Sequence, residues 1–277
     1  MATEAIFIPE SPEAALDLLS EHGRDLLVIG GGTAAMVLIN EGTISPRLVM
    51  SLHRARLNEV RAVDEHLEIG ATASLARVAQ LSALPLLADA ARHIGGWAIR
   101  NMATLAGNLF VPPPAGDAAV ALLALDAEVM AARKSGTRKL PLTKFFKGRA
   151  QTALGPDELV TRIDVPRPSG AAVFLKLGRR RMNTPAVVTA AVRLVQDGQG
   201  ICVDARIALG AAGEHPLRAT QAEAVLQGRK LDTSSIADAA ALATQAANPS
   251  SDALASEWYR RKMVGVCVRR ALEAIPR

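Results

Sequence analysis

Residues 92–117 read RHIGGWAIRNMATLAGNLFVPPPAGD, and this stretch is the candidate ligand-holding centre of the chain. It is rich in small residues, has little charge and contains three consecutive prolines. Its glycines permit close backbone approaches that a Cβ would block, which suits peptide N–H groups that wrap a phosphate or a flat ring. Thr104 and Asn108 add a hydroxyl and an amide beside that backbone. An ordinary turn followed by a proline-stiffened loop explains the same composition, so both interpretations stay open here.

A second glycine-rich segment precedes it. Residues 25–29 are predicted to form a buried strand that runs directly into three glycines at 30–32 and Thr33, followed by AAMVLINEG. A strand, a glycine turn and a helix in this order can present backbone N–H groups to a pyrophosphate. The segment matches neither GxGxxG nor GxxxxGK[ST], so it indicates neither a Rossmann nor a P-loop site. A tight turn without a ligand is the alternative.

Composition predicts a folded, cytoplasmic protein. With 277 residues, 49% of them hydrophobic, the chain is long enough for one large domain or two to three small ones. Cys202 and Cys267 are its two cysteines, too few for an iron–sulfur cluster or a cysteine zinc site, and we expect buried thiols in a reducing compartment. Acidic residues and prolines near the N-terminus do not fit a signal peptide, and no apolar run reaches membrane-spanning length.

Charge and motif content exclude several functions. The net charge of +5 does not indicate nucleic-acid binding, because only 3% of residues are aromatic and the basic residues are spread along the chain. The exception is the run of arginines at 179–181, which is either a solvated loop or a contact for an anion or partner. None of the five histidines lies in HExxH, and GxSxG is absent, so neither metal nor hydrolase chemistry is expected.

The order of predicted elements favours an α+β protein. Ser11, Pro12 and Gly23 bound a helix, and Ser74 begins a second helix predicted to run from 74 to 87. The pattern then predicts a continued helix at 88–94, a buried alanine-rich helix after Asp117 and an antiparallel hairpin ending near residue 209. Further strands are expected at 47–51, 128–132, 158–165 and 174–176, a hairpin at 59–71 and helices from 220 onward.

Three motifs together are more specific than either glycine segment alone. IGGGT occupies 29–33, IRNMATLAGN at 99–108 is followed nine residues later by Asp117, and FLK at 174–176 precedes RRRMNTPAVV. In these motifs the chain resembles, over nearly its whole length, the FAD-binding medium subunit of molybdenum hydroxylases. This is the family of carbon monoxide dehydrogenase and xanthine dehydrogenase. Ala106 stands where the family usually has glycine, and its added methyl group affects local backbone geometry more than FAD binding.

The resemblance implies an α+β, two-subdomain FAD-binding fold of the vanillyl-alcohol-oxidase/PCMH type. Residues 1–55 would form the N-terminal FAD-binding subdomain and residues 56–170 the second. Residues 171–277 would form a C-terminal domain of a small antiparallel sheet and a helical bundle.

The resemblance also implies the cofactor-binding residues. Asp117 would bind adenosine or ribityl hydroxyls, and Val160 would lie beside the flavin. Lys176 would lie near the polar edge of the ring, where a cation can stabilise negative charge on reduced flavin. The pyrophosphate would be wrapped by Val28, Ile29, Gly30, Gly31, Gly32, Thr33, Ala34 and Ala35, and the cradle completed by Thr104, Leu105, Gly107 and Asn108. No catalytic acid–base residue and no metal ligand is expected, and the arginines at 179–181 would belong to a loop that shields the flavin or to a partner or acceptor surface.

The implied function is electron transfer within a larger oxidoreductase. FAD in this chain would take electrons from [2Fe-2S] clusters in a small partner subunit and pass them to an external acceptor. A large partner subunit would carry the molybdenum cofactor, and the complex would be a dimer of heterotrimers, a heterohexamer. A stand-alone FAD oxidase or dehydrogenase is the alternative, but the chain has no added substrate domain. A flavin-free scaffold is a third possibility, which the glycine segments disfavour.

Overall fold

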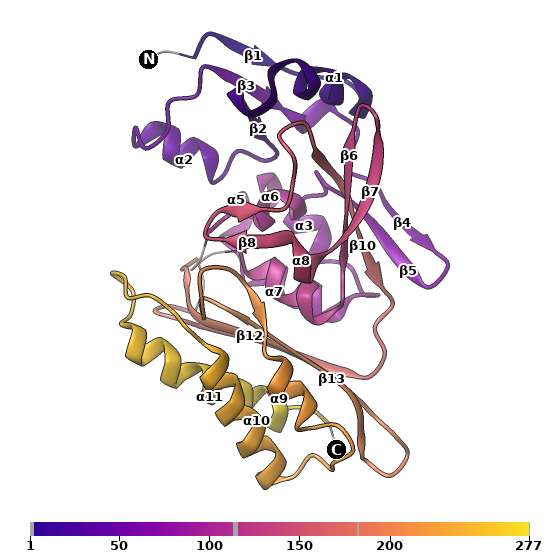
Figure 1. The fold of residues 1–277 in the computed structure, drawn as a ribbon, viewed down its shortest axis with the longest axis vertical. Coiled ribbons are helices and arrows are strands. Elements are labelled where there is room, and N and C mark those ends of the chain that lie inside the picture. The colour runs from indigo at the N-terminus through magenta and orange to yellow at the C-terminus, as the bar shows by residue number, and fades with distance from the viewer. Residues whose placement is uncertain (1–2, 113–115, 182, 277) are drawn as a thin grey trace.

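The computed structural model describes residues 3–112, 116–181 and 183–276, so part of the proline run lies outside the described residues. Helices and sheets alternate along the chain, and three sheets are built from successive stretches of sequence (Figure 1). No helix within these ranges combines the length and apolar character needed to cross a bilayer.

The N-terminal sheet is small and parallel. It contains β1 (Ala5–Phe7), β2 (Leu26–Ile29) and β3 (Leu48–Ser51) in the order β1-β3-β2, with α1 (Pro12–His22) and α2 (Ala35–Asn40) as connections. Two short 3₁₀ helices, η1 (Gly23–Asp25) and η2 (Leu52–Arg54), follow α1 and β3. The Ser11 hydroxyl caps α1 by accepting a hydrogen bond from the Ala14 amide, as the sequence predicts.

The central sheet has five antiparallel strands in the order β4-β5-β10-β6-β7. These are β4 (Val60–Val63), β5 (His66–Gly70), β6 (Glu128–Arg133), β7 (Gly136–Pro141) and β10 (Leu159–Pro166). Five helices accompany it: α3 (Leu75–Val78), α4 (Pro85–Arg92), α5 (Trp97–Met102), α6 (Leu105–Leu109) and α7 (Asp117–Ala124). A connection after β7 contains α8 (Leu142–Phe145), β8 (Phe146–Gly148) and β9 (Gln151–Thr152). Every residue of α7 is buried, which confirms the predicted buried helix.

Two predictions of helical structure were wrong in the same region. The single helix expected over 74–87 is two helices, α3 and α4, because Pro85 cannot continue a preceding helix and instead occupies the first position of α4. No helix was predicted at the glycine-rich stretch 104–108, which is largely the helix α6. Thr104 caps that helix through a hydrogen bond from the Gly107 amide, at 3.1 Å, and the sequence pattern was too short to indicate it.

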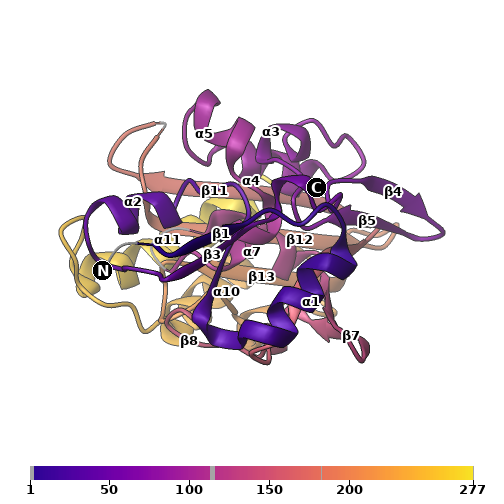
Figure 2. The same ribbon diagram turned by 90° about the horizontal axis from the view of Figure 1, so that it is seen from above.

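The C-terminal sheet is antiparallel and covered on both faces. It contains β11 (Ala171–Gly178), β12 (Ala186–Gln196), β13 (Cys202–Gly210) and β14 (Leu217–Arg218), followed by α9 (Thr220–Ala224), α10 (Thr233–Ala246) and α11 (Glu257–Glu273). The sheet lies between α7 on one side and α10 and α11 on the other (Figures 1 and 2). This double covering explains why the first nine residues of β12 are all buried.

A charged cluster joins this sheet to the central region. Asp126, in the turn after α7, accepts hydrogen bonds from Arg206 and Arg218, each at 2.8 Å, and from Arg193 at 3.3 Å. Asp204 and Glu223 pair with the same arginines, so three carboxylates balance three guanidinium groups. The Arg193 and Arg218 side chains are only 10% and 12% exposed, so they depend on these partners.

We expect Asp126→Asn to lower the free energy of unfolding by about 2 kcal/mol, because it leaves buried guanidinium charge uncompensated but Asp126 itself is partly exposed. Asparagine tolerates the left-handed backbone of Asp126 (φ 52°), so the substitution removes mainly the charge. Urea unfolding measures the change. Asp64→Asn is the matched control: Asp64 also has positive φ (46°) but is exposed in the β4–β5 turn, and its substitution should change stability by under about 0.5 kcal/mol. Equal effects of the two substitutions would contradict the role of the cluster.

Candidate functional site

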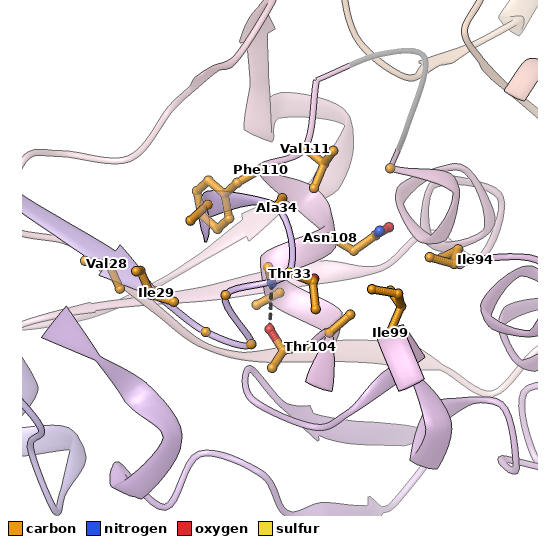
Figure 3. Close-up of a pocket in the computed structure, with 18 of the residues that line it drawn as sticks. Val28, Ile29, Thr33, Ala34, Ile94, Ile99, Thr104, Asn108, Phe110 and Val111 are labelled. Atoms are coloured by element: carbon orange, nitrogen blue, oxygen red, sulfur yellow. Dashed lines mark hydrogen bonds between the residues drawn. The ribbon is translucent and has the colours of Figure 1, made fainter. Parts of the chain in front are cut away.

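A cavity of about 610 Å³ is lined by residues from all three parts of the fold: the N-terminal sheet, the central region and the C-terminal sheet (Figure 3). Its lining comes from the β2–α2 connection, from the stretch around α5 and α6, from the start of β10, and from β11 with residues 183–185. Every residue predicted to form the site lines this cavity except Leu105, whose side chain is fully buried in the hydrophobic core. The structure therefore gathers segments more than a hundred residues apart in sequence around one space.

The glycine turn after β2 packs against the backbone that precedes α6. A Cβ on Gly31 would overlap the carbonyl oxygen of Met102, and a Cβ on Gly30 would lie 2.6 Å from the Thr104 hydroxyl. Gly32 has φ +72°, a conformation that side chains with a Cβ rarely adopt. The three glycines are thus required by a close approach and by a left-handed turn.

The turn leaves a row of backbone donors without protein partners. Within the ranges that the structure describes, the N–H groups of residues 31–34 donate no hydrogen bond to another protein group. Four successive N–H groups at a turn form a concave site of positive partial charge that suits an anion. A ligand bearing phosphate oxygens would satisfy them.

The backbone of α6 differs, because its N–H groups are already used. The amides of Leu105 and Ala106 donate to the carbonyls of Ala73 and Ala71, and those of Gly107 and Asn108 donate to the hydroxyl and carbonyl of Thr104. The contribution of this segment to the cavity is therefore close packing and side chains, in place of the free peptide donors that the sequence suggested. A Cβ on Gly107 would lie 2.7 Å from the Thr104 hydroxyl, which explains the glycine.

Asn108 and Gly116 place the start of α7 at the cavity. The Asn108 Oδ1 atom accepts a hydrogen bond from the Ala118 amide at 3.0 Å. Gly116 adopts a left-handed conformation (φ 86°) immediately before the helix. Together they direct Asp117, the first residue of α7, toward the lining.

Asp117 and Lys176 form a buried ion pair in the cavity wall. The Lys176 Nζ atom lies 2.6 Å from Asp117 Oδ2 and donates a second hydrogen bond, of 2.9 Å, to the carbonyl of His93. Both side chains are less than a tenth exposed. Burial raises the pKa of Asp117, although the ammonium group of Lys176 and its hydrogen bond oppose that rise.

The pair retains unused hydrogen-bonding capacity. Among the described residues, Asp117 Oδ1 has no protein donor and the third Nζ hydrogen of Lys176 has no protein acceptor. Both groups line the cavity, so a bound ligand with hydroxyls or ring heteroatoms could use them.

Apolar side chains form the remaining walls, and most of them were not predicted. Val160, predicted from its motif, is buried and sits where the β10–β6 register shifts. A register shift of this kind changes the direction in which a side chain points. Ile94 and Ile99 face the same cavity beside Asn108 (Figure 3), and Phe110 and Val111 lie along it. Nothing in their local sequence separates these residues from ordinary core residues.

The C-terminal part of the chain adds a second unpredicted contribution. Asn183, Thr184 and Pro185 line the cavity just before β12. The neighbouring arginines at 179–181 are exposed and do not line it. The motif pointed to this loop, but not to which of its residues reach the cavity.

A possible metal-ligand group lies away from the cavity. His66, Glu68 and Asp164 bring ligand atoms within 4.8 Å of one another on β5 and β10. Arg162 lies 2.9 Å from Glu68 and 2.8 Å from Asp164, and Lys139 lies 3.4 Å from Asp164. These cations compensate the carboxylates, which favours an ion-pair network over a metal site.

Comparison with known proteins adds an independent observation. Residues 2–168 match the family profile of the FAD binding domain in molybdopterin dehydrogenase, and residues 173–275 match that of the CO dehydrogenase flavoprotein C-terminal domain. The glyceraldehyde dehydrogenase medium chain of Sulfolobus acidocaldarius is 31% identical over 273 residues, which cover 96% of both chains. The alpha subunit of the 6-hydroxypseudooxynicotine dehydrogenase complex of Paenarthrobacter nicotinovorans is 33% identical over 96% of this chain and 92% of its own length.

A solved structure extends the likeness to three dimensions. A chain of the reconstituted CO dehydrogenase from Oligotropha carboxidovorans superposes with a TM-score of 0.94 at 29% sequence identity, and the match covers 99% of both chains.

The glycine turn gives a direct test of the cavity. We expect Gly31→Ala to abolish FAD retention, because the new Cβ meets a backbone carbonyl that no side-chain rotation can clear. The ratio of FAD to protein after purification, read from the absorption spectrum, measures the loss. Gly96→Ala is the matched control, since a Cβ there meets nothing within 4 Å and its backbone is extended. Full FAD content in Gly31→Ala would show that the turn is not part of the binding site.

Proposed function

This chain belongs to the family of FAD-binding medium subunits of molybdenum hydroxylases, and from that membership we propose that its cavity holds FAD between the glycine turn and the Asp117–Lys176 pair. The resemblance read from the three motifs is confirmed, as are the α+β fold class and FAD as the cofactor of this chain. The chain is the flavoprotein subunit of an oxidoreductase of this family.

The free N–H groups at residues 31–34 are the observation that carries the proposed binding mode. Unsatisfied backbone donors at a turn are costly unless water or a ligand pairs with them, and the FAD pyrophosphate supplies negatively charged acceptors. In this arrangement Val28, Ile29, Ala34 and Ala35 continue the cradle on either side of the turn. The Thr104 hydroxyl accepts from Gly107 and keeps its own hydrogen to donate.

The ion pair is assigned to the polar groups of the cofactor. Asp117 would accept hydrogen bonds from ribose or ribityl hydroxyls through its free Oδ1 atom. Lys176 would donate its third hydrogen to the polar edge of the ring, with Val160 packed beside the flavin. Because Asp117 already offsets the charge of Lys176, the lysine acts chiefly as an oriented donor.

When bound, FAD supplies the electron transfer that no side chain of this protein can perform. We place the other redox centres in partner chains: [2Fe-2S] clusters in a small subunit and the molybdenum cofactor in a large one, in a cytoplasmic dimer of heterotrimers that reduces an external acceptor. The relatives' names support a division into subunits, since they include medium chains and a complex subunit. The domain division at residues 55 and 170 is part of the same proposal, and the N-terminal, central and C-terminal sheets each lie within one of these parts.

Exposed apolar side chains on α2 and α5 support the proposal that this chain contacts a partner subunit. On α2, Met36 and Val37 are nearly half exposed, and on α5, Trp97 and Met102 are 73% and 62% exposed. Gly31, which precedes α2, approaches the backbone of Met102 at the end of α5, so both helices adjoin the glycine turn. Exposed large apolar side chains of this kind are typical of a protein–protein interface, and we assign them to contact with a partner subunit.

Expression with and without the neighbouring genes tests the function. We expect the chain produced alone to bind FAD but to oxidise no small substrate, whereas the chain purified with its partners should be reduced by the substrate of the complex. A Met36→Gln, Trp97→Gln double variant should keep its FAD and lose its partners in size-exclusion chromatography. Val203→Gln is the control, because Val203 is 54% exposed on β13 and does not line the cavity. Substrate turnover by the lone flavoprotein would instead favour a stand-alone oxidase or dehydrogenase.

Lys176→Met tests the assigned role of the ion pair. Loss of the donor should destabilise reduced flavin more than oxidised flavin. The two-electron midpoint potential should therefore fall by about 30 mV or more, the equivalent of a tenfold change in relative affinity. Spectroelectrochemical titration of the bound flavin measures the shift. Lys144→Met, which removes an exposed lysine outside the cavity, should leave the potential unchanged, and an unchanged potential in Lys176→Met would contradict the assignment.

A further inference from the structure

Arg260 is a fully buried arginine that lies outside the cofactor cavity. It occupies the first turn of α11 and is 2% exposed. Its Nη2 atom contacts both carboxylate oxygens of Asp252, at 2.8 and 2.7 Å. Its Nη1 atom donates to the carbonyls of Val187 and Ala186, at 2.7 and 3.3 Å.

Those two carbonyls belong to the start of β12, directly after the segment that reaches the cavity. Asn183, Thr184 and Pro185 line the cavity, and Ala186 is the next residue. The middle of the segment packs on β11, where a Cβ on Gly178 would lie 2.6 Å from the Thr184 side chain. The segment is therefore held by tight packing at Thr184 and, through the two residues that follow it, by Arg260.

The Asp252 carboxylate is held by backbone hydrogen bonds in addition to its contact with Arg260. Its Oδ1 atom accepts hydrogen bonds from the amides of Leu254 at 2.9 Å and Ala255 at 3.1 Å. A carboxylate held by backbone donors sets the direction of the guanidinium group, which has a rigid planar arrangement of donors. The turn at 252–255 therefore orients Arg260, and Arg260 in turn fixes the position of the β12 carbonyls.

We propose that the Arg260–Asp252 pair is a positioning unit that holds residues 183–185 against bound FAD. The inference rests on the proposed cofactor site and extends it to residues that do not touch the cavity.

Stability alone is a weak reason for this arrangement. Buried ion pairs often contribute little relative to apolar side chains of similar volume, because removing both charges from water offsets their attraction. Among the described residues, the Nε atom of Arg260 has no hydrogen-bond partner, so the burial is not fully compensated. The hydrogen bonds that are made go to the base of the cavity-lining segment, which fits a positional role.

Arg260→Met is the main test, since methionine keeps an apolar stem in the same space and removes the hydrogen bonds. In the flavin-loaded complex, we expect FAD dissociation and iodide quenching of flavin fluorescence each to increase about tenfold, the loss of roughly one strong hydrogen-bonded contact. The slow alkylation of Cys267 should stay as in the wild type. Cys267 is a buried thiol on α11, and burial raises its pKa to about 11, so its alkylation reports whether the helix stays docked.

Arg261→Met is the matched control. Arg261 is the adjacent residue of α11, but it is 44% exposed and pairs with Glu257 on the surface. Its substitution should change neither FAD dissociation nor quenching. Asp252→Asn provides a second variant that leaves Arg260 in place but weakens its anchor, and we expect a smaller change in the same direction.

Four results separate the possibilities. Faster FAD loss and greater quenching in Arg260→Met, with Cys267 still protected, support the positioning role. If Arg260→Met exposes Cys267, α11 has come loose, and an Asp252→Asn variant with protected Cys267 and wild-type FAD retention would then overturn the inference. Wild-type FAD behaviour in Arg260→Met also overturns it, whereas a wild-type chain that binds no FAD contradicts the proposed function itself.

Discussion

The close approach of the glycine turn to the backbone before α6 is the constraint on which the site depends. Gly31 leaves no space between itself and the Met102 carbonyl, so the turn after the N-terminal sheet meets the central region backbone to backbone. That contact fixes where the free N–H groups at 31–34 lie relative to Thr104 and the rest of the lining. A side chain at this crossing would separate the two walls of the cavity.

The third wall of the cavity comes from the C-terminal domain, and ion pairs hold it against the central region. Lys176 reaches Asp117 from β11, and the cluster around Asp126 holds the same sheet against the turn after α7. Burying these groups removes charge from water, which is tolerable only because each has an opposite partner. The site thus depends on steric contact at one junction and on electrostatic pairing at the other.

Sequence reasoning found the parts of the site that have a local signature. The glycine turn could be predicted because a strand followed by consecutive glycines has a direct backbone meaning, and the resemblance supplied Asp117, Val160 and Lys176. Leu105 is the one predicted site residue that does not line the cavity, because proximity to Thr104 in sequence does not reveal that its side chain turns into the core. Sequence reasoning missed the break at Pro85 and the helix α6, where a proline and a capping threonine outweigh the apolar pattern. Arg260 could not have been found, since its contacts with β12 are more than seventy residues distant in sequence.

Amide hydrogen exchange with and without FAD tests whether the glycine turn holds the pyrophosphate, because the two glycine-rich segments differ in how their N–H groups are bonded. The amides of residues 31–34 have no protein acceptor within the described chain, whereas those of 105–108 are bonded within the protein. We expect residues 31–34 to exchange rapidly in the FAD-free chain and to become protected when FAD binds, while residues 105–108 are protected in both states. Equal exchange at 31–34 with and without FAD would contradict the assignment of the glycine turn as the pyrophosphate cradle.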